Sequence, residues 1–165
     1  MTDPRGTLQR VAEETFQALA FMFPLSPEEA AAMAPTAAAD AAAESPCTAE
    51  VRFSGPVHGK LRLDVSPGML APLAANMLGL EFDQEPTPEQ QADALKELLN
   101  VICGNVLPEL TSRSDVYNVD APQLLEPAAS PADDEYTALA QVALPLDAGA
   151  ARLELFVHKD AQIAA

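Results

Sequence analysis

The chain has 165 residues, of which 48% are hydrophobic, and its 25 acidic and 9 basic side chains give a formal net charge of −16. This length suits one domain, and the apolar fraction is that of a globular protein. The strong negative charge repels phosphate backbones and anionic lipids, so we expect neither nucleic acid nor a membrane as partner. No apolar run approaches the about 20 residues of a membrane span. The first residues, MTDPRG, lack a signal-peptide pattern, and we expect a cytoplasmic protein.

Few side chains suit nucleophilic or metal-assisted catalysis. The chain has two histidines and two cysteines, and it lacks both a glycine-rich phosphate loop and a His-Glu-x-x-His motif. His58 and His158 fall on the polar phase of alternating segments and are predicted to face solvent. Cys103 falls on an apolar helix face, which predicts an inert buried thiol, although the sequence leaves a Cys–His pair open. We expect no metal site and no cofactor bound by this chain.

Four predicted helices begin with the same chemical pattern, a polar residue followed by proline. They start at Asp3-Pro4, Ser26-Pro27, Ser66-Pro67 and Thr87-Pro88. The polar side chain accepts an otherwise unpaired backbone N–H, and proline lacks a donor where none is needed. Two of these starts also have capping-box spacing, from Ser26 to Glu29 and from Thr87 to Gln90.

The first predicted helix has an apolar face at helical spacing. The face consists of Leu8, Val11, Ala12, Thr15, Leu19 and Met22. Alanine and proline dominate the next stretch, residues 24–46. We predict a short helix over residues 27–33 and a low-complexity, mobile connection over residues 35–46.

Two alternating pairs of segments predict two hairpins. In the first, residues 49–53 and 57–65 place apolar side chains on one face and charged ones on the other, which should be wet. The second pairs residues 138–146 with 153–157, after a polar link at residues 127–134. Between the hairpins lie a short helix ending at Gly79, a long helix over residues 88–107 and an extended piece at residues 116–119.

This order of elements predicts the fold class. Runs of helix and runs of hairpin replace strict βαβ alternation, which favours a two-layer α+β fold with long helices packed on one face of a largely antiparallel sheet. The repeated order of helix and then hairpin is consistent with a weak internal duplication. The sheet edges at the two hairpins need a cover, which favours a homodimer.

The long helix carries the strongest functional signal. Its core-facing stripe is Leu95, Leu98, Leu99, Ile102, Val106 and Leu110. Glu97 lies roughly opposite this stripe, Asn100 lies about 60° from Glu97, and Gly104 falls between them in angle. Asn and Gly each cost a helix interior about 0.5–1 kcal/mol relative to Ala, so their presence on one exposed strip suggests a function beyond a solvated surface.

The segment from Glu97 to Asn105, ELLNVICGN, resembles the signature of the CheC/CheX/FliY family of chemotaxis phosphatases, Glu-x-x-Asn followed by Gly-Asn. The surrounding order of elements agrees, including the short helix that ends Met77-Leu78-Gly79 and the segment Asp120-Ala-Pro122. A single signature copy is most similar to the CheX branch. The resemblance implies one CheX-like domain over residues 1–165.

The resemblance also implies a function. Such proteins hydrolyse the aspartyl phosphate of a CheY-like response regulator, whose own pocket supplies Mg²⁺ and a lysine. By analogy, Asn100 would orient the attacking water and Glu97 would pair with the regulator's lysine. Gly104 would give clearance, and Asn105, nearer the core, would form a structural hydrogen bond. Phosphoryl transfer of this kind needs positioning more than a new nucleophile.

Three features depart from the pattern or extend it. Pro108 is expected to end or kink the helix near Leu107. The first helix carries Glu14-Thr-Phe-Gln17, a weak match to the second site of two-site relatives and more often ordinary surface. Phe21, on nearly the same outward side, is predicted to be a packing or dimer contact.

The sequence is also compatible with two other functions. The main alternative is a catalytically silent CheX-like module that binds a response regulator without hydrolysis. A small-molecule hydrolase is the third hypothesis, and it requires a deep apolar pocket beside Cys103 and a histidine.

Overall fold

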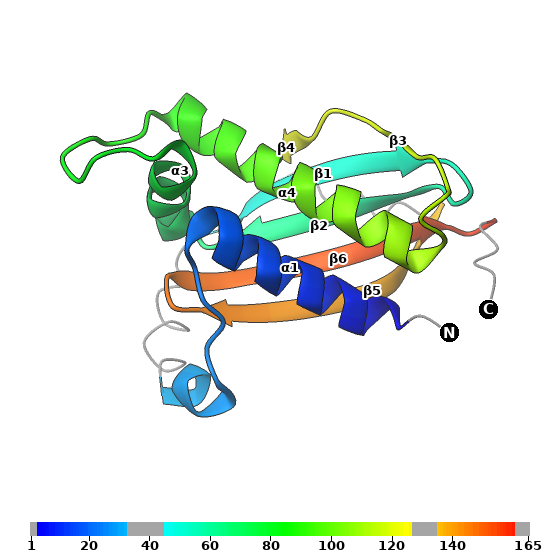
Figure 1. Cartoon of the computed structure of the whole chain (residues 1–165), viewed down its shortest axis with the longest axis horizontal. Helices are drawn as coiled ribbons and strands as arrows, with labels where there is room; N and C mark the ends of the chain where they lie inside the picture. The colour runs from blue at the N-terminus through cyan, green and yellow to red at the C-terminus, as the bar shows by residue number, and fades with distance from the viewer. Residues whose placement is uncertain (1–2, 33–44, 127–134, 161–165) are drawn as a thin grey trace.

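A computed structural model describes residues 3–32, 45–126 and 135–160. Two long helices, α1 (Pro4–Ala20) and α4 (Pro88–Leu110), lie side by side across one face of an antiparallel sheet (Figure 1). The two-layer α+β fold predicted from the sequence is confirmed. The predicted link at residues 127–134, and the predicted connection at residues 35–46 except for its last two residues, lie outside the described residues.

The two predicted hairpins pair with each other and make up most of one sheet. They are β1 (Cys47–Ser54) with β2 (Gly59–Val65), and β5 (Tyr136–Leu146) with β6 (Gly149–His158). The strand order is β3-β1-β2-β6-β5, where β3 (Asn118–Val119) pairs with β1, as does β4 (Gln123–Leu125). Within the described residues, part of the outer edge of β5 is covered by the chain itself, because the Leu25 N–H donates to the Pro145 carbonyl at 2.9 Å.

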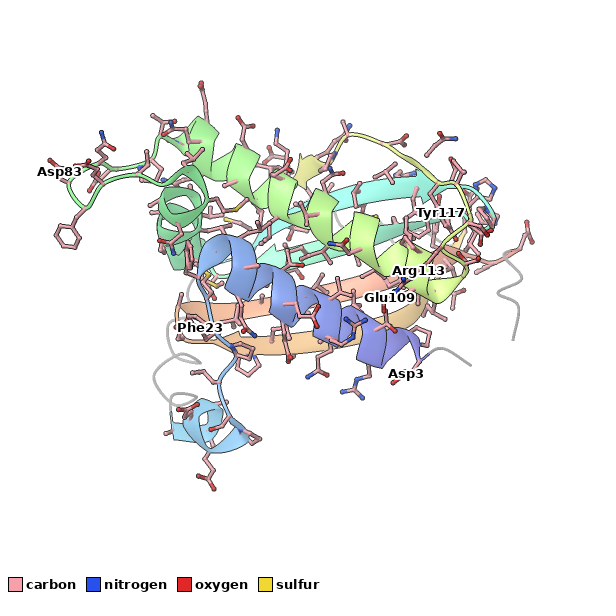
Figure 2. The ribbon with its side chains drawn as sticks, viewed as in Figure 1. Asp3, Phe23, Asp83, Glu109, Arg113 and Tyr117 are labelled. Atoms are coloured by element: carbon pink, nitrogen blue, oxygen red, sulfur yellow. The ribbon has the colours of Figure 1, made fainter. Side chains whose placement is uncertain are left out.

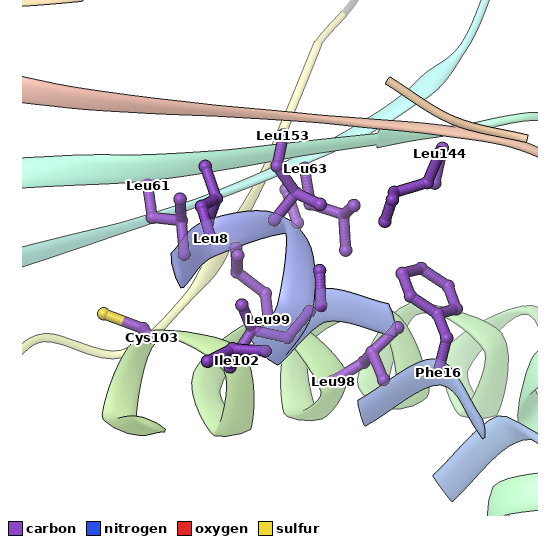
Figure 3. Packing of buried hydrophobic residues seen from close by; sticks show 14 of the residues in the cluster. Leu8, Phe16, Leu61, Leu63, Leu98, Leu99, Ile102, Cys103, Leu144 and Leu153 are labelled. Atoms are coloured by element: carbon purple, nitrogen blue, oxygen red, sulfur yellow. The ribbon is translucent and has the colours of Figure 1, made fainter. Parts of the chain in front are cut away.

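The core lies between the helices and the sheet (Figure 3). Fully buried members include Leu8 of α1, Leu98 and Ile102 of α4, and Leu63 and Leu153 of the sheet. The predicted stripe on α1 omitted Phe16, which is 0% exposed. The stripe was too narrow because α1 contacts α3 (Leu70–Leu78), α4 and β5 together, and three neighbours bury a wider arc than one.

Three of the four predicted helix caps are confirmed. The Asp3 carboxylate accepts the Arg5 N–H at 3.1 Å. Reciprocal capping-box bonds join Thr87 with Gln90, and Ser26 with Glu29 ahead of the helical residues 27–32. Gly79 ends α3 in the left-handed conformation, at a φ of 66°.

The predicted cap at Ser66 is wrong. Its hydroxyl accepts the Ala150 N–H at 3.1 Å and donates to the Ala150 carbonyl at 3.2 Å, so β6 occupies the oxygen that would have capped a helix. The chain instead makes a 3₁₀ turn, Pro67–Met69, and α3 begins only at Leu70.

Pro108 was expected to end or kink the long helix near Leu107; the expected end is wrong, and the kink stays a prediction. Helix α4 continues to Leu110, and the Thr111 N–H then bonds the Leu107 carbonyl at 3.4 Å. Proline has a φ that fits a helix, and its cost here is the missing hydrogen bond to the Gly104 carbonyl. Burial of Leu107 and Leu110 against the core offsets that cost.

The outer face of the first hairpin is less exposed to solvent than predicted. Glu50 and Lys60 are only 8% and 4% exposed. Arg62 Nη2 lies 2.9 Å from a Glu50 carboxylate oxygen, and Lys60 Nζ lies 3.8 Å from the same oxygen. The Lys60 ammonium also lies 4.9 Å from the centre of the Tyr136 ring and 5.4 Å from that of Phe156. The charges are buried because ion pairs and aromatic faces replace water around them.

No helix among the described residues combines the length and the apolar character that crossing a bilayer requires.

Removing the carboxylate from this cluster is expected to destabilise the fold. Glu50→Ala removes the carboxylate that three nearby cations, Arg52, Lys60 and Arg62, share. We expect the free energy of unfolding to fall by about 3 kcal/mol, as for other broken buried pairs. Urea denaturation measures it, with the exposed Glu85→Ala as a matched control that should change the value by less than about 0.5 kcal/mol. Equal losses in the two variants would contradict the role given to Glu50.

Candidate functional site

Glu97, Asn100 and Gly104 lie in succession on the exposed side of α4, and we call them the α4 strip. All three are exposed, whereas Leu98 and Leu99, on the other side of the same turns, are 0% exposed. In the part of the chain that the structure describes, the side chains of Glu97 and Asn100 make no hydrogen bond or ion pair. A carboxylate and an amide are therefore exposed one helical turn apart, without a partner among the described residues.

Two features make the α4 strip rigid. The Thr87–Gln90 capping box and Pro88 fix the start of α4. Leu95, Leu98, Leu99 and Ile102 anchor the opposite face in the core. Backbone helical bonds and buried side chains on every turn leave the strip little freedom except at the χ angles of Glu97 and Asn100.

No packing contact within the described chain requires a glycine at position 104. A Cβ built at this position meets no atom within 4 Å, so the fold leaves room for a side chain. Glycine in a helix interior costs about 1 kcal/mol relative to alanine. The observation therefore favours the predicted role, in which another molecule approaches the backbone closely at this point.

The structural hydrogen bond predicted for Asn105 is wrong. Asn105 is exposed, and its side chain bonds nothing among the described residues. The polar link between α1 and α4 is made elsewhere, by an ion pair of Arg10 with Glu109.

The weak second-site candidates, Glu14 and Gln17, lie on α1, a different helix from the α4 strip. Glu14 is exposed but already has a cation, because Arg10 Nη1 lies 3.3 Å from its carboxylate. Gln17 is half-buried. Phe21, which follows α1 in a left-handed conformation, is 62% exposed, so it is not an internal packing contact. Its role as a dimer contact stays a prediction.

The groups that nucleophilic catalysis would need are not brought together. Cys103 is 1% exposed, and burial raises the pKa of its thiol to about 12. His58 is exposed, and His158 lies edge-on to Tyr136, with Nδ1 3.6 Å from the Asp160 carboxylate. The described residues contain no group of three or more His, Cys, Asp or Glu side chains that could hold a metal ion.

A small hollow does lie near the end of α4. Its lining includes Leu107, Leu110 and Tyr117, but neither Cys103 nor a histidine, and its volume is about 10 Å³. That is room for about one water molecule. The hollow gives no support to the small-molecule hydrolase hypothesis.

The sequence reasoning missed Phe82, which the structure places fully exposed on the turn before α4. The sequence does show a lone aromatic residue in an acidic segment, GLEFDQEP, which begins with glycine and ends with proline.

Comparison with known proteins shows the family. The model of the family described as chemotaxis phosphatase CheX matches residues 47–135, more than half of the chain. The chain belongs to the CheX family. The matched region includes the whole of α4 and therefore the α4 strip. No curated protein sequence gives a significant match.

Solved structures of the CheX and FliY proteins share the fold. The chemotaxis protein CheX from Desulfovibrio desulfuricans is 13% identical with a TM-score of 0.65, over 95% of this chain and all of that chain. CheX in the CheX–CheY–BeF₃–Mg²⁺ complex from Borrelia burgdorferi is 16% identical with a TM-score of 0.63, over 96% of this chain and all of that chain. FliY from Thermotoga maritima is 14% identical with a TM-score of 0.55, over 98% and 92%.

The buried thiol generates a test. In a Cys47→Ser variant, Cys103 is the remaining thiol, and it should stay protonated up to a pH near its pKa of about 12. We expect negligible reaction with a thiol reagent at pH 8 in the native state, because both burial and protonation suppress the thiolate. Unfolding in urea should give one equivalent of reaction. Rapid labelling of the native protein would show that Cys103 is accessible and would reopen the nucleophile hypothesis.

Proposed function

We propose that this chain hydrolyses the aspartyl phosphate of a CheY-like receiver domain, using the α4 strip. The observation that carries the proposal is the pair Glu97 and Asn100, exposed and without internal partners on one rigid helix of a CheX-family protein. The Borrelia burgdorferi structure, in which a CheX is in complex with CheY, BeF₃ and Mg²⁺, supports a receiver domain as the substrate.

In this reaction, Asn100 positions water. Its side-chain amide enters the receiver's phosphorylation pocket and holds a water molecule in line with the bond to be broken. The water oxygen forms a new bond to phosphorus while the bond to the aspartyl oxygen breaks. The products are inorganic phosphate and the free aspartate carboxylate, and the water protons leave on phosphate or to solvent. An amide suffices because orientation of this kind contributes through proximity and not through a new nucleophile.

Glu97 and Gly104 serve docking. The Glu97 carboxylate pairs with the receiver's lysine and so sets the depth and direction in which Asn100 enters. Gly104, one turn beyond Asn100, lets the receiver's backbone approach the helix. The Mg²⁺ belongs to the receiver's phosphorylation site, and no metal is assigned to this chain. The excess of carboxylates along α4 attracts such a cationic site, with an effect on association rate that salt weakens.

Replacing Asn100 tests the proposal. We expect wild-type protein to shorten the lifetime of phosphate on one receiver domain from the same organism, and Asn100→Ala to lose about 10²-fold or more of that acceleration. Asn100 is exposed, so urea denaturation should show an unchanged fold. Asn118→Ala, another exposed asparagine but on β3, is the control that keeps full activity.

Two results would overturn this assignment. Full activity in Asn100→Ala would remove Asn100 from the reaction. Tight binding of a phosphorylated receiver by the wild-type protein, with an unchanged phosphate lifetime, would favour the silent binding module instead.

Gly104 provides a second test, in which stability and activity should change in opposite directions. In Gly104→Ala the added methyl group meets no atom of the fold, so the free energy of unfolding should rise by about 0.5–1 kcal/mol. The same methyl group should hinder the approaching receiver and raise KM for the phosphorylated domain. Urea denaturation and steady-state kinetics measure the two effects. Higher stability with unchanged kinetics would show that no molecule approaches the helix at Gly104.

A further inference from the structure

The connection between α3 and α4 presents a single aromatic ring to solvent. It projects from the body of the molecule, with Asp83 near its tip (Figures 1 and 2). Phe82, beside Asp83, has a relative exposure of 108%, the highest of any large hydrophobic residue in the described ranges. Leu78, at the end of α3, is 51% exposed. A partner that covered this ring would remove its apolar surface from water, which favours association.

The segment that holds Phe82 has a defined conformation. The Gln84 N–H donates to the Glu81 carbonyl at 3.0 Å, and the Glu81 N–H donates to the Gln84 side-chain oxygen at 3.1 Å. On either side of this turn, Gly79 caps α3 and Thr87 caps α4. A ring held on such a turn loses little conformational entropy when it docks.

The charges around Phe82 continue to the α4 strip. Exposed carboxylates run from the turn along α4, and they are Glu81, Asp83, Glu85, Glu89, Asp93 and Glu97. The first cation after the turn is Lys96, whose ammonium lies 3.3 Å from the Asp93 carboxylate. We call these carboxylates, together with Phe82, the acidic ridge. Its charge selects a partner with a basic surface and disfavours anionic membranes and other copies of this chain, which carry a net charge of −16.

One bound domain can extend from the α4 strip to the start of α4, next to the turn that holds Phe82. The ten residues of α4 from Pro88 to Glu97 rise about 15 Å along the helix axis. A domain of about 100 residues has a radius of gyration of about 13 Å and is therefore more than about 26 Å across. A receiver domain seated on the α4 strip and directed toward the start of α4 therefore covers this length and lies beside the turn.

We propose that Phe82 anchors the receiver domain by inserting its ring into an apolar recess with a basic rim, at a distance from the phosphorylation site. This inference rests on the proposed function and adds a specificity contact to it. Phe82 lies outside the reacting groups, so it determines which receiver binds and how tightly. It leaves the rate of hydrolysis within the complex to Asn100.

Kinetics of Phe82→Ala with the receiver that the wild-type protein dephosphorylates test the anchor. We expect KM to rise about tenfold and kcat to stay within about twofold of wild type. Phe82→Leu should recover part of the loss, because it restores apolar volume. Val116→Ala is the matched control, since Val116 is 80% exposed but follows the opposite end of α4. The control should leave KM and kcat unchanged.

The outcomes separate this inference from the proposed function. An unchanged KM in Phe82→Ala, with activity still lost in Asn100→Ala, overturns the anchor and leaves the phosphatase intact. If the wild-type protein accelerates the dephosphorylation of no receiver domain, the role of Phe82 is tested by binding. Wild type and Phe82→Ala are then titrated with receiver domains that carry BeF₃ and Mg²⁺. Weaker binding by Phe82→Ala than by wild type then supports the anchor, and no binding by wild type overturns it. Light scattering that shows a dimer in wild type and a monomer in Phe82→Ala assigns the ring to a second copy and also overturns it.

Discussion

Helix α4 must both fill the core and carry exposed polar groups, and the rest of the structure depends on this combination. Its inner face must fill the core against α1, α3 and the first hairpin. Its outer face must carry polar groups that the fold itself does not use. A helix separates the two demands because residues three and four apart share a face, so Leu98 and Ile102 can anchor the turns that present Asn100. The sheet, α1 and α3 hold α4 in place.

Periodicity was sufficient to predict the two long helices, the two hairpins and the side of α4 that is exposed, but it did not predict β4. Contacts between segments distant in sequence were not predictable in this way. Ser66 has the local chemistry of a helix cap, but Ala150, 84 residues further on, takes its hydroxyl. Alternation placed Glu50 and Lys60 on the polar face correctly, yet their burial depends on Tyr136 and Phe156, which reach them only through the pairing of the two hairpins.

The site was predictable in part for the same reason. Glu97, Asn100 and Gly104 share an outward strip by helical geometry alone, whereas the role proposed for them rests on the resemblance to the family and not on the spacing. Asn105 shows that the angle of a residue around the helix axis does not by itself determine its burial. Its angle placed it near the core, but burial at that angle requires a neighbour at the same height along α4. The ion pair of Arg10 with Glu109 shows that the nearby polar contact is made one turn further on.

In the proposed reaction, the receiver domain supplies the metal, the lysine and the phosphoryl group, and this chain positions the water. Such a reaction requires no pocket of reactive side chains on this chain. The buried Cys103 is held as a neutral thiol, and the candidate groups Glu97 and Asn100 lie on a convex helix rather than in a pocket. A convex site is adequate if the metal, the lysine and the phosphoryl group all belong to the partner, because what must then be supplied is an amide at the correct depth. Under that arrangement, rigidity and docking replace local reactivity. The core face of α4, the glycine at position 104 and the acidic ridge then contribute to catalysis as directly as any titratable group, since each controls where the Asn100 amide lies when the two proteins meet.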